Sequence, residues 1–364
     1  MNTPMLGFDP ASLSVFAQPE KPANSFNQNI YHPRPADSKS TDGVYRATLR
    51  VIYSPQNIQG SVLERQSYGL TDAQGFFQVV SKLTKNDTSC PIFTAWKTCH
   101  FSKNPVLLAQ AQTKDKGGNG LFDKRYERYV TVQIIDDQNK PELNGQYMFF
   151  KLPKAIWETI DNKMRPSAES NRASIPVMDP LFGRLIYLEV KPGPDDPKAP
   201  ERKTREISYA ATEVSDDIQA CTNPDGSALL NAEEQAILDK YVDAMGKVWK
   251  SRNAEERQKL STEIAEDPNT AKLHEIYARV IEEMKKFVPD LNAELGYKEW
   301  DEKTTQRVQN WINVVLTGKD PKTVIVAEGT ATAATEVVTV PVSTEVGVVP
   351  AAAPATDTSD DLPF

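Results

Sequence analysis

The stretch Tyr45-Arg46-Ala47-Thr48-Leu49-Arg50-Val51-Ile52-Tyr53 (residues 45–53) alternates apolar side chains with mostly polar ones. Successive side chains of a β-strand point to opposite faces, so this alternation predicts a half-buried strand. Arg46 and Arg50 then share the face opposite the apolar side chains. A sheet that carries cations on one surface is therefore the starting point of the fold.

Short runs of the same kind recur downstream, separated by turn residues such as Asn144-Gly145. One helix, predicted over Lys154–Met164 after Pro153, interrupts them. Many short strands with one helix are typical of a small Greek-key barrel of the OB type. The further strands are predicted at Ser61–Tyr68, Phe76–Ser81, Tyr129–Ile135, Tyr147–Lys151, Leu185–Val190 and Ile207–Ala211.

The apolar period changes to 3.6 after Ser227, and Asn231 and Glu234 have the spacing of a capping box. Later helices are predicted around Leu273–Met284 and Val308–Leu316. The predicted fold class is α+β, with an OB-like Greek-key barrel followed by a small helical bundle. Its parts are an extended N-terminal arm at 1–42, the barrel at 43–226, the bundle at 227–320, and a disordered linker with an acidic tail at 321–364.

Composition indicates ordered domains flanked by unfolded segments, because only 39% of the 364 residues are hydrophobic and 26 are prolines. No run approaches the roughly 18 to 20 apolar residues that a membrane span needs. The first residues lack the layout of a signal peptide, and three irregularly spaced cysteines fit a reducing compartment. We expect a cytoplasmic protein without membrane contact.

Charge is unevenly distributed along the chain, whose net charge is −8. Residues 43–214 carry 24 Lys and Arg against 19 Asp and Glu, whereas the remainder carries 18 against 31. A basic middle with acidic ends is what a protein needs if its middle binds a polyanion.

Cations and aromatic rings alternate between residues 114 and 151. Binding of an unpaired nucleic acid strand needs this mixture, because cations follow the phosphates while rings stack on bases. Alternate positions of a barrel strand point inward, so the alternative is that half of these rings belong to the core. The predicted DNA-contacting residues are Arg46, Arg50, Lys114, Lys116, Lys124, Arg125, Tyr126, Arg128, Tyr129, Tyr147, Phe150 and Lys151.

The segment Asp360-Asp361-Leu362-Pro363-Phe364 combines acidic side chains with an apolar ring beside a carboxylate. Phe364 offers apolar area for a partner's pocket, and Asp360 and Asp361 add steering toward a basic rim. The alternative is an acidic end that only aids solubility. The tip is similar to that of bacterial single-stranded DNA-binding proteins, which implies recruitment of replication, recombination or repair proteins.

The order of features from Lys124 onward resembles the DNA-binding core of the T4-type bacteriophage single-stranded DNA-binding proteins. The resemblance spans roughly 45–214 and implies that Tyr129 and Phe150 line the strand-binding cleft, with Trp157 in the core. It also implies phosphate contacts by Lys124, Arg125 and Lys151. The matching motifs are Lys124-Arg125, the strand Tyr129–Ile135, the turn Asp137–Gly145, Phe150-Lys151 and Lys154-Ala155-Ile156-Trp157.

This chain differs from that family at the zinc site. Phe93 occupies the position of the final zinc ligand, after Cys90-Pro91-Ile92. Cys90, Cys99 and His100 remain as a three-ligand alternative, but neighbours on a strand point to opposite sides and structural zinc takes four ligands. We therefore expect no metal and no other cofactor.

Together these patterns and the resemblance to the T4-type family predict a protein that coats and protects single-stranded DNA in phage replication, recombination and repair. We expect it to act in the host cytoplasm and to self-associate on the strand. The alternative is a replisome adaptor or virion-associated interaction protein without DNA affinity. Enzymatic activity is not expected. The sequence suggests no acidic or basic partner residue for catalysis beside His32, His100 or His274, and it contains no phosphate-binding loop motif.

Overall fold

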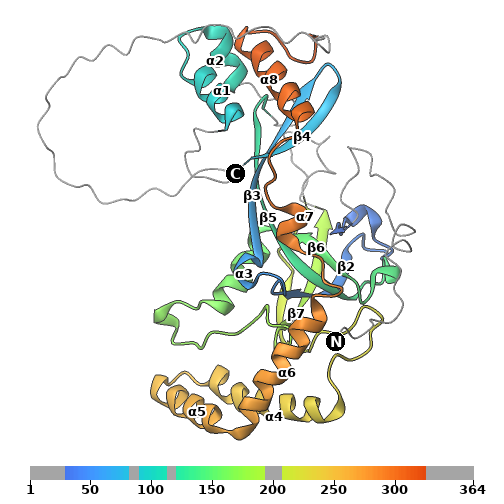
Figure 1. Cartoon of the computed structure of the whole chain (residues 1–364), viewed down its shortest axis with the longest axis vertical. Helices are drawn as coiled ribbons and strands as arrows, with labels where there is room; N and C mark the ends of the chain where they lie inside the picture. Colours follow the sequence, from blue (N-terminus) through green and yellow to red (C-terminus); the bar gives the residue numbers. More distant parts are fainter. Residues whose placement is uncertain (1–28, 82–89, 113–119, 193–206, 325–364) are drawn as a thin grey trace, which may run out of the picture. The chain divides into compact units, whose positions relative to one another are not determined.

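The computed structural model describes residues 29–81, 90–112, 120–192 and 207–324 (Figure 1). All described residues belong to one compact unit. The predicted cations Lys114 and Lys116, and the tip Asp360–Phe364, lie outside the described residues. Across the described residues, no helix has the length and apolar character needed to cross a membrane.

A mixed nine-stranded sheet forms the centre of the fold. Its main path runs β1-β6-β5-β2-β7-β8, with the β3–β4 hairpin joined to β5 and β9 joined to β7. Among the described residues the path does not close, so the predicted OB-type barrel is not shown. The strands are β1 (Ile30–Tyr31), β2 (Tyr45–Ile52), β3 (Val62–Asp72), β4 (Gly75–Ser81), β5 (Asp123–Asp136), β6 (Tyr147–Lys151), β7 (Arg184–Pro192), β8 (Ile207–Ser208) and β9 (Glu213–Ile218).

Strand β5 joins two regions of the sheet because its two halves have different partners. Residues 123–130 pair with β3, and residues 131–136 pair with β2. On its other edge β6 pairs with residues 129–133. The strand is therefore longer than the predicted Tyr129–Ile135, and the added first half carries several of the predicted cations.

The first hydrophobic core lies between β2, β5, β6 and β7 and the helix α3 (Lys154–Met164), which forms over the predicted residues. The predicted Asn144-Gly145 turn joins β5 to β6. Gly145 has φ +85, and a Cβ there would lie 2.4 Å from the carbonyl oxygen of Pro224. Only glycine fits both the backbone conformation and the close approach.

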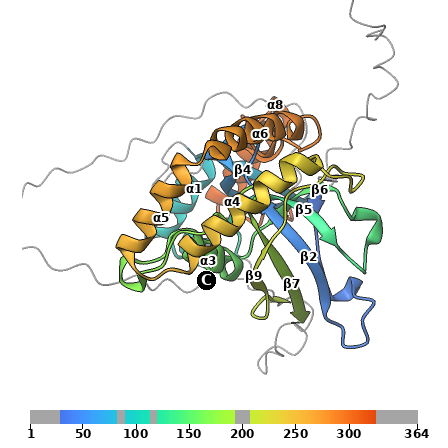
Figure 2. The same ribbon diagram turned by 90° about the horizontal axis from the view of Figure 1, so that it is seen from below.

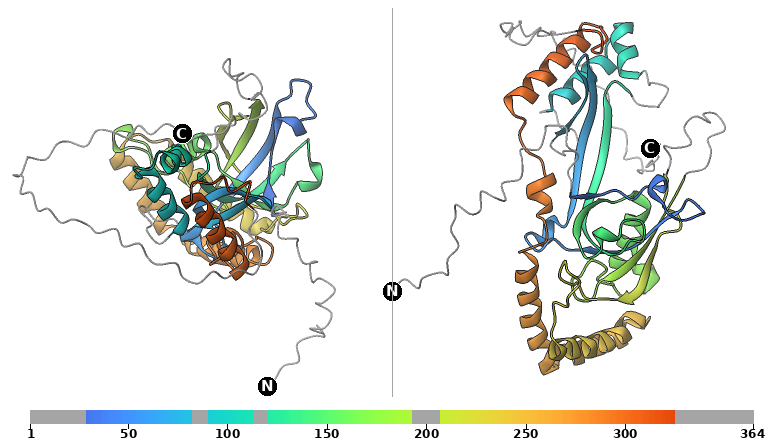
Figure 3. Two further views of the ribbon diagram at one scale, coloured as in Figure 1. Left: turned by 90° about the horizontal axis from the view of Figure 1, so that it is seen from above. Right: turned by 90° about the vertical axis from the view of Figure 1, so that its right-hand side faces the viewer.

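A second core covers the β3–β4 hairpin and the first half of β5. Helices α1 (Pro91–His100), α2 (Pro105–Gln112) and α8 (Glu302–Leu316) supply its other side (Figure 3). The buried Trp311 of α8 donates a hydrogen bond from Nε1 to the carbonyl oxygen of Thr71 at 3.0 Å. Arg307 of the same helix donates to both carboxylate oxygens of Asp72.

The remaining helices are α4 (Ala232–Lys250), α5 (Ala254–Glu266), α6 (Pro268–Met284) and α7 (Leu291–Leu295). The predicted capping box is present, since the Asn231 side chain accepts from the Glu234 amide and Glu234 accepts from the Asn231 amide. Helices α4, α5 and α6 pack on one another (Figure 2). The predicted bundle must be corrected, because α8 packs on α1 in the second core and not on these helices.

Candidate nucleic-acid interface

The first half of β5 presents alternating cations and a ring on one face. Lys124 and Tyr126 are exposed and Arg128 is half-buried, while the intervening Glu127 is buried. Tyr126 exposes 61% of its surface, and the ammonium Nζ of Lys124 lies 4.8 Å from the centroid of the Tyr126 ring. This strand face therefore offers an accessible ring with cations on both sides of it.

A cleft of about 400 Å³ opens beside Tyr126 and Arg128. Four segments that are distant in sequence build it: the residues after β1, strand β5, the β6–α3 junction, and β8 with the residues just after it. Four of the side chains that line it are cationic, and none of the described lining residues is acidic. The lining residues are Tyr31, His32, Pro33, Arg34, Tyr126, Arg128, Phe150, Lys151, Leu152, Pro153, Lys154, Ile207 and Tyr209.

Two of the cations are held in place by carboxylates outside the cleft lining. Arg128 donates from Nε to Glu64 at 2.9 Å. Lys151 donates from Nζ to Glu127 at 2.9 Å, and Arg65 donates to the other oxygen of the same carboxylate, also at 2.9 Å. These pairs fix where the positive groups lie before any ligand arrives, which reduces the entropy lost on binding.

The other two cations stand on exposed side chains. Arg34 is exposed, and the Lys154 side chain is 72% exposed, with Nζ 3.9 Å from Glu158. An exposed ion pair at this separation contributes little to stability.

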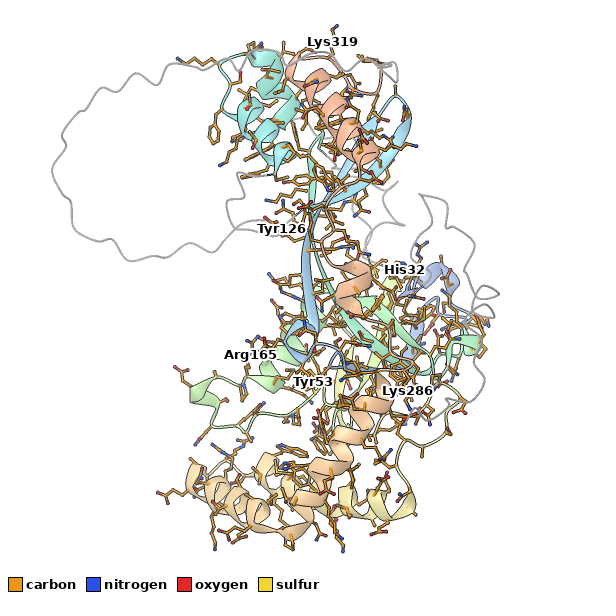
Figure 4. The ribbon with its side chains drawn as sticks, in the orientation of Figure 1. His32, Tyr53, Tyr126, Arg165, Lys286 and Lys319 are labelled. Atoms are coloured by element: carbon orange, nitrogen blue, oxygen red, sulfur yellow. The ribbon has the colours of Figure 1, made fainter. Side chains whose placement is uncertain are left out.

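His32 reports the electrostatic character of the cleft. Burial lowers its pKa, and the positive charges of Arg34, Lys140 and Lys151 lower it further. Burial penalises any charge, but the contribution of these three cations is positive potential, which attracts an anion. Figure 4 labels His32 and Tyr126 among the cleft residues.

The structure brings together four of the residues predicted to contact DNA, namely Tyr126, Arg128, Phe150 and Lys151. Lys124 lies next along the exposed face of β5. Phe150 is only 2% exposed, so it forms the floor of the cleft and presents little ring area to a ligand.

Other predicted contacts lie elsewhere. Arg50 is completely buried and donates from Nη2 to the carbonyl oxygen of Asp179 at 2.6 Å. Its strand β2 lies between β5 and β7, and core residues cover the side chain, so the expected solvent face does not exist at this position. Arg46 pairs with Asp42 and Glu189, and Arg125 pairs with Asp123 and lines a different cavity.

Two predicted stacking rings belong to the cores. Tyr129 is 4% exposed, and its hydroxyl oxygen accepts from Arg65 Nη2 at 3.0 Å. Tyr147 is 8% exposed and donates to the carbonyl oxygen of Thr222 at 2.6 Å. Neither ring has a free face for a base, although both were predicted to contact DNA and Tyr129 was expected to line the strand-binding cleft.

No family model and no curated protein matches this chain. A function for this chain is therefore argued from the geometry of the cleft.

The two cysteines considered as zinc ligands face the second core. Residues 91–100 form helix α1 and not the strand that was assumed, and Cys90, the N-cap residue, and Cys99 are both buried. His100 is turned away from them and stacks on Trp96, with ring centroids 4.7 Å apart. Within the described residues, no group of three His, Cys, Asp or Glu side chains is arranged to hold a metal ion.

Sequence reasoning missed His32, Arg34, Lys154 and Tyr209 as residues of the cleft. His32 and Arg34 fell in the segment interpreted as an extended arm. Strand β1 in fact pairs with β6, matching Tyr31 with Phe150, and so carries the following residues to the cleft. The available signal was the apolar pair Ile30-Tyr31, which is too short to predict a strand by periodicity.

Proposed function

We propose that this chain binds single-stranded DNA and that the cleft beside Tyr126 is where the strand lies. One observation supports this function above the others. Arg34, Arg128, Lys151 and Lys154 converge from separate segments on one cleft whose described lining has no acidic side chain, and an exposed tyrosine stands at its edge.

The chemistry follows from these groups. Phosphates of the strand occupy the positions between the four cations, and the first base outside them stacks on the Tyr126 ring. Paired bases have no free face for such a ring, so stacking favours an unpaired strand over a duplex. The cations contact phosphates and the Tyr126 ring stacks on a base face, so neither contact depends on the edges that distinguish one base from another. We therefore expect binding to tolerate any base sequence.

The wider role proposed for the chain is to coat and protect single-stranded DNA in phage replication, recombination and repair. The resemblance of residues 45–214 to the T4-type proteins supports this role. Recruitment of partner proteins by the tip Asp360–Phe364 and a non-catalytic role are parts of the same proposal, and both rest on the sequence alone.

A second candidate is an adaptor that binds protein. The observation that favours it is a cavity of about 810 Å³ at the end of the β3–β4 hairpin. Its lining includes Phe76 and Val106, whose exposed fractions are 56% and 51%. Such a chain would keep the tip and show no affinity for oligonucleotides.

The deciding experiment is fluorescence anisotropy with labelled oligo-dT and the matching duplex over a salt series. If all four cations contact phosphates, the logarithm of affinity should fall against the logarithm of salt with a slope of about −3. Tyr126→Ala should weaken binding of oligo-dT by about five-fold or more, the loss of one stacked base.

Matched variants make the result specific to the cleft. Lys154→Ala should reduce the magnitude of the salt slope by about 0.7. Lys259→Ala should leave the slope unchanged, although Lys259 has the same spacing to a glutamate, the same 3.9 Å separation and a similar exposure of 78%. Absence of binding, or equal effects of the two substitutions, would favour the adaptor.

A further inference from the structure

Helix α1 carries a ladder of aromatic rings that the cleft does not use. Phe93 stacks on Trp96 with ring centroids 5.6 Å apart and planes 12° from parallel. Trp96 stacks on His100 at 4.7 Å and 19°, and His100 meets the ring of Phe101 edge-on at 4.9 Å. We call these four residues the α1 ladder.

The α1 ladder borders the second core, against which Phe93 and Trp96 pack with part of their surface. Ile92, Ala95 and Cys99 are the buried residues of α1, while Phe93, Trp96 and His100 are half-buried. Phe101 follows the last turn and exposes 74% of its surface. An aromatic cluster that ends in a ring as exposed as Phe101 is characteristic of an interaction site.

Cations accompany the rings. Lys97 Nζ lies 4.8 Å from the centroid of the Phe93 ring, and Lys124 Nζ lies 5.0 Å from the same ring. Neither lysine pairs with a carboxylate of any described residue. Their charges are therefore available to an anionic ligand.

Lys124 connects the α1 ladder to the cleft. Its ammonium lies between the Phe93 ring and the Tyr126 ring, 5.0 Å and 4.8 Å from their centroids. Tyr126 in turn lines the cleft. Rings and cations thus follow one another without interruption from the cleft to Phe101.

We propose that the α1 ladder is a second platform for the same DNA strand, which leaves the cleft past Tyr126 and continues over Phe93 toward Phe101. A base stacks on the exposed ring of Phe101, and the phosphates of the strand leading to it lie near Lys124 and Lys97. Alternating rings and cations are the chemistry that unpaired nucleic acid requires, whereas an apolar protein partner would gain nothing from two lysines over the rings. This platform presupposes the strand-binding function proposed above.

Oligonucleotide length separates the two regions. An oligo-dT of about 4 nucleotides can fill only the cleft, while one of about 16 nucleotides is long enough to reach the ladder as well. In the full chain, Phe101→Ala should weaken binding of the long oligonucleotide by about five-fold or more and leave the short one unchanged. Tyr126→Ala should weaken both.

Phe76→Ala is the matched control, because Phe76 is also an exposed phenylalanine beside the second core but lies outside the ladder. It should change neither affinity. A second readout is intrinsic tryptophan fluorescence, in which Trp96→Phe should remove part of the quenching caused by the long oligonucleotide and none of that caused by the short one.

The outcomes are distinguishable from failure of the proposed function. If neither oligonucleotide binds the unsubstituted chain, the strand-binding function itself is overturned. If both bind and Phe101→Ala changes neither affinity, the ladder is not part of the DNA path, and its rings remain as a surface for protein.

Discussion

The guanidinium of Arg128 lies over the indole of Trp157, with its Cζ atom 4.8 Å from the ring centroid. The same guanidinium donates to Glu64, so a ring from α3 and a carboxylate from β3 hold it from two sides. Arg128 is thereby positioned within the cleft before a strand binds. Trp157, predicted as a core residue, is half-buried and supports the arginine as well as the core.

Substitutions of Arg128 should separate its charge from its shape. Arg128→Lys keeps the charge but loses the planar group that fits the ring and the carboxylate. It should reduce affinity for oligo-dT by a few-fold, corresponding to about 1 kcal/mol, with an unchanged salt slope. Arg128→Ala should also reduce the magnitude of the slope by about 0.7. Identical slopes for the two variants in the anisotropy titration would mean that Arg128 touches no phosphate.

Glu127→Gln should destabilise the fold at neutral pH. Burial raises the pKa of Glu127, but the hydrogen bonds and charges of Lys151 and Arg65 outweigh it, and the pKa is lowered overall. The stabilisation is therefore present above the unfolded pKa of about 4.3 and is lost as the pH falls through the folded value. We expect a cost of about 1.5 to 3 kcal/mol at pH 7 and a smaller one at pH 3, measured by urea unfolding.

The control for this variant is Glu263→Gln on α5, where the side chain is 58% exposed and its lysine partner lies 3.9 Å away. It should change the free energy of unfolding by less than about 0.5 kcal/mol at either pH. A Glu127→Gln cost that stays constant from pH 7 to pH 3 would show that the carboxylate charge is not the stabilising element.

DNA binding should strengthen as the pH falls from 7.5 to 5.5. The pKa of His32 is lowered in the free protein by burial and by Arg34, Lys140 and Lys151. A bound phosphate offsets those positive charges and raises the pKa again, so the complex takes up a proton and acid favours it. Titrations of oligo-dT across this range should show the trend in the unsubstituted chain and in His274→Gln, but not in His32→Gln.

Trp311→Ala should destabilise the second core strongly. The Trp311 side chain is 1% exposed, meets Phe122 edge-on with ring centroids 5.2 Å apart, and loses its hydrogen bond to Thr71 when truncated. A loss of about 3 to 5 kcal/mol is expected in chemical denaturation. Leu316→Ala on the same helix, at a position 36% exposed, should cost much less. Equal costs would contradict the packing of α8 on the hairpin.

Local signals in the sequence were sufficient for elements that depend on neighbours in the chain. The Asn231 and Glu234 capping box and the Asn144-Gly145 turn were predicted and are present. The element that packs on a helix is not predicted by such signals. Periodicity shows which face of the helix is apolar, but it does not show which other element covers that face. This is why α8 was placed in a bundle although its Val308 and Trp311 pack against α1 and the β3–β4 hairpin.

The same limit applies to the cleft. Tyr126 and Tyr129 were both expected to contact DNA. The structure shows that β5 already begins at Asp123, which places the two rings on opposite faces, and Tyr126 is the exposed one. The Arg50 face was predicted to be open because β2 alternates, whereas residues around Asp179, far along the chain, cover it. Long-range contacts of this kind leave no local signal.

Helix α8 has a consequence for synthesis on the ribosome. The bond from Trp311 to Thr71 joins residues 240 positions apart. At ordinary translation rates the hairpin emerges about 12 to 50 s before the helix that covers it. During that interval Tyr68, Leu70 and Phe77 lack their partners from α8, and exposed apolar surface of this kind is what makes a nascent chain prone to aggregation.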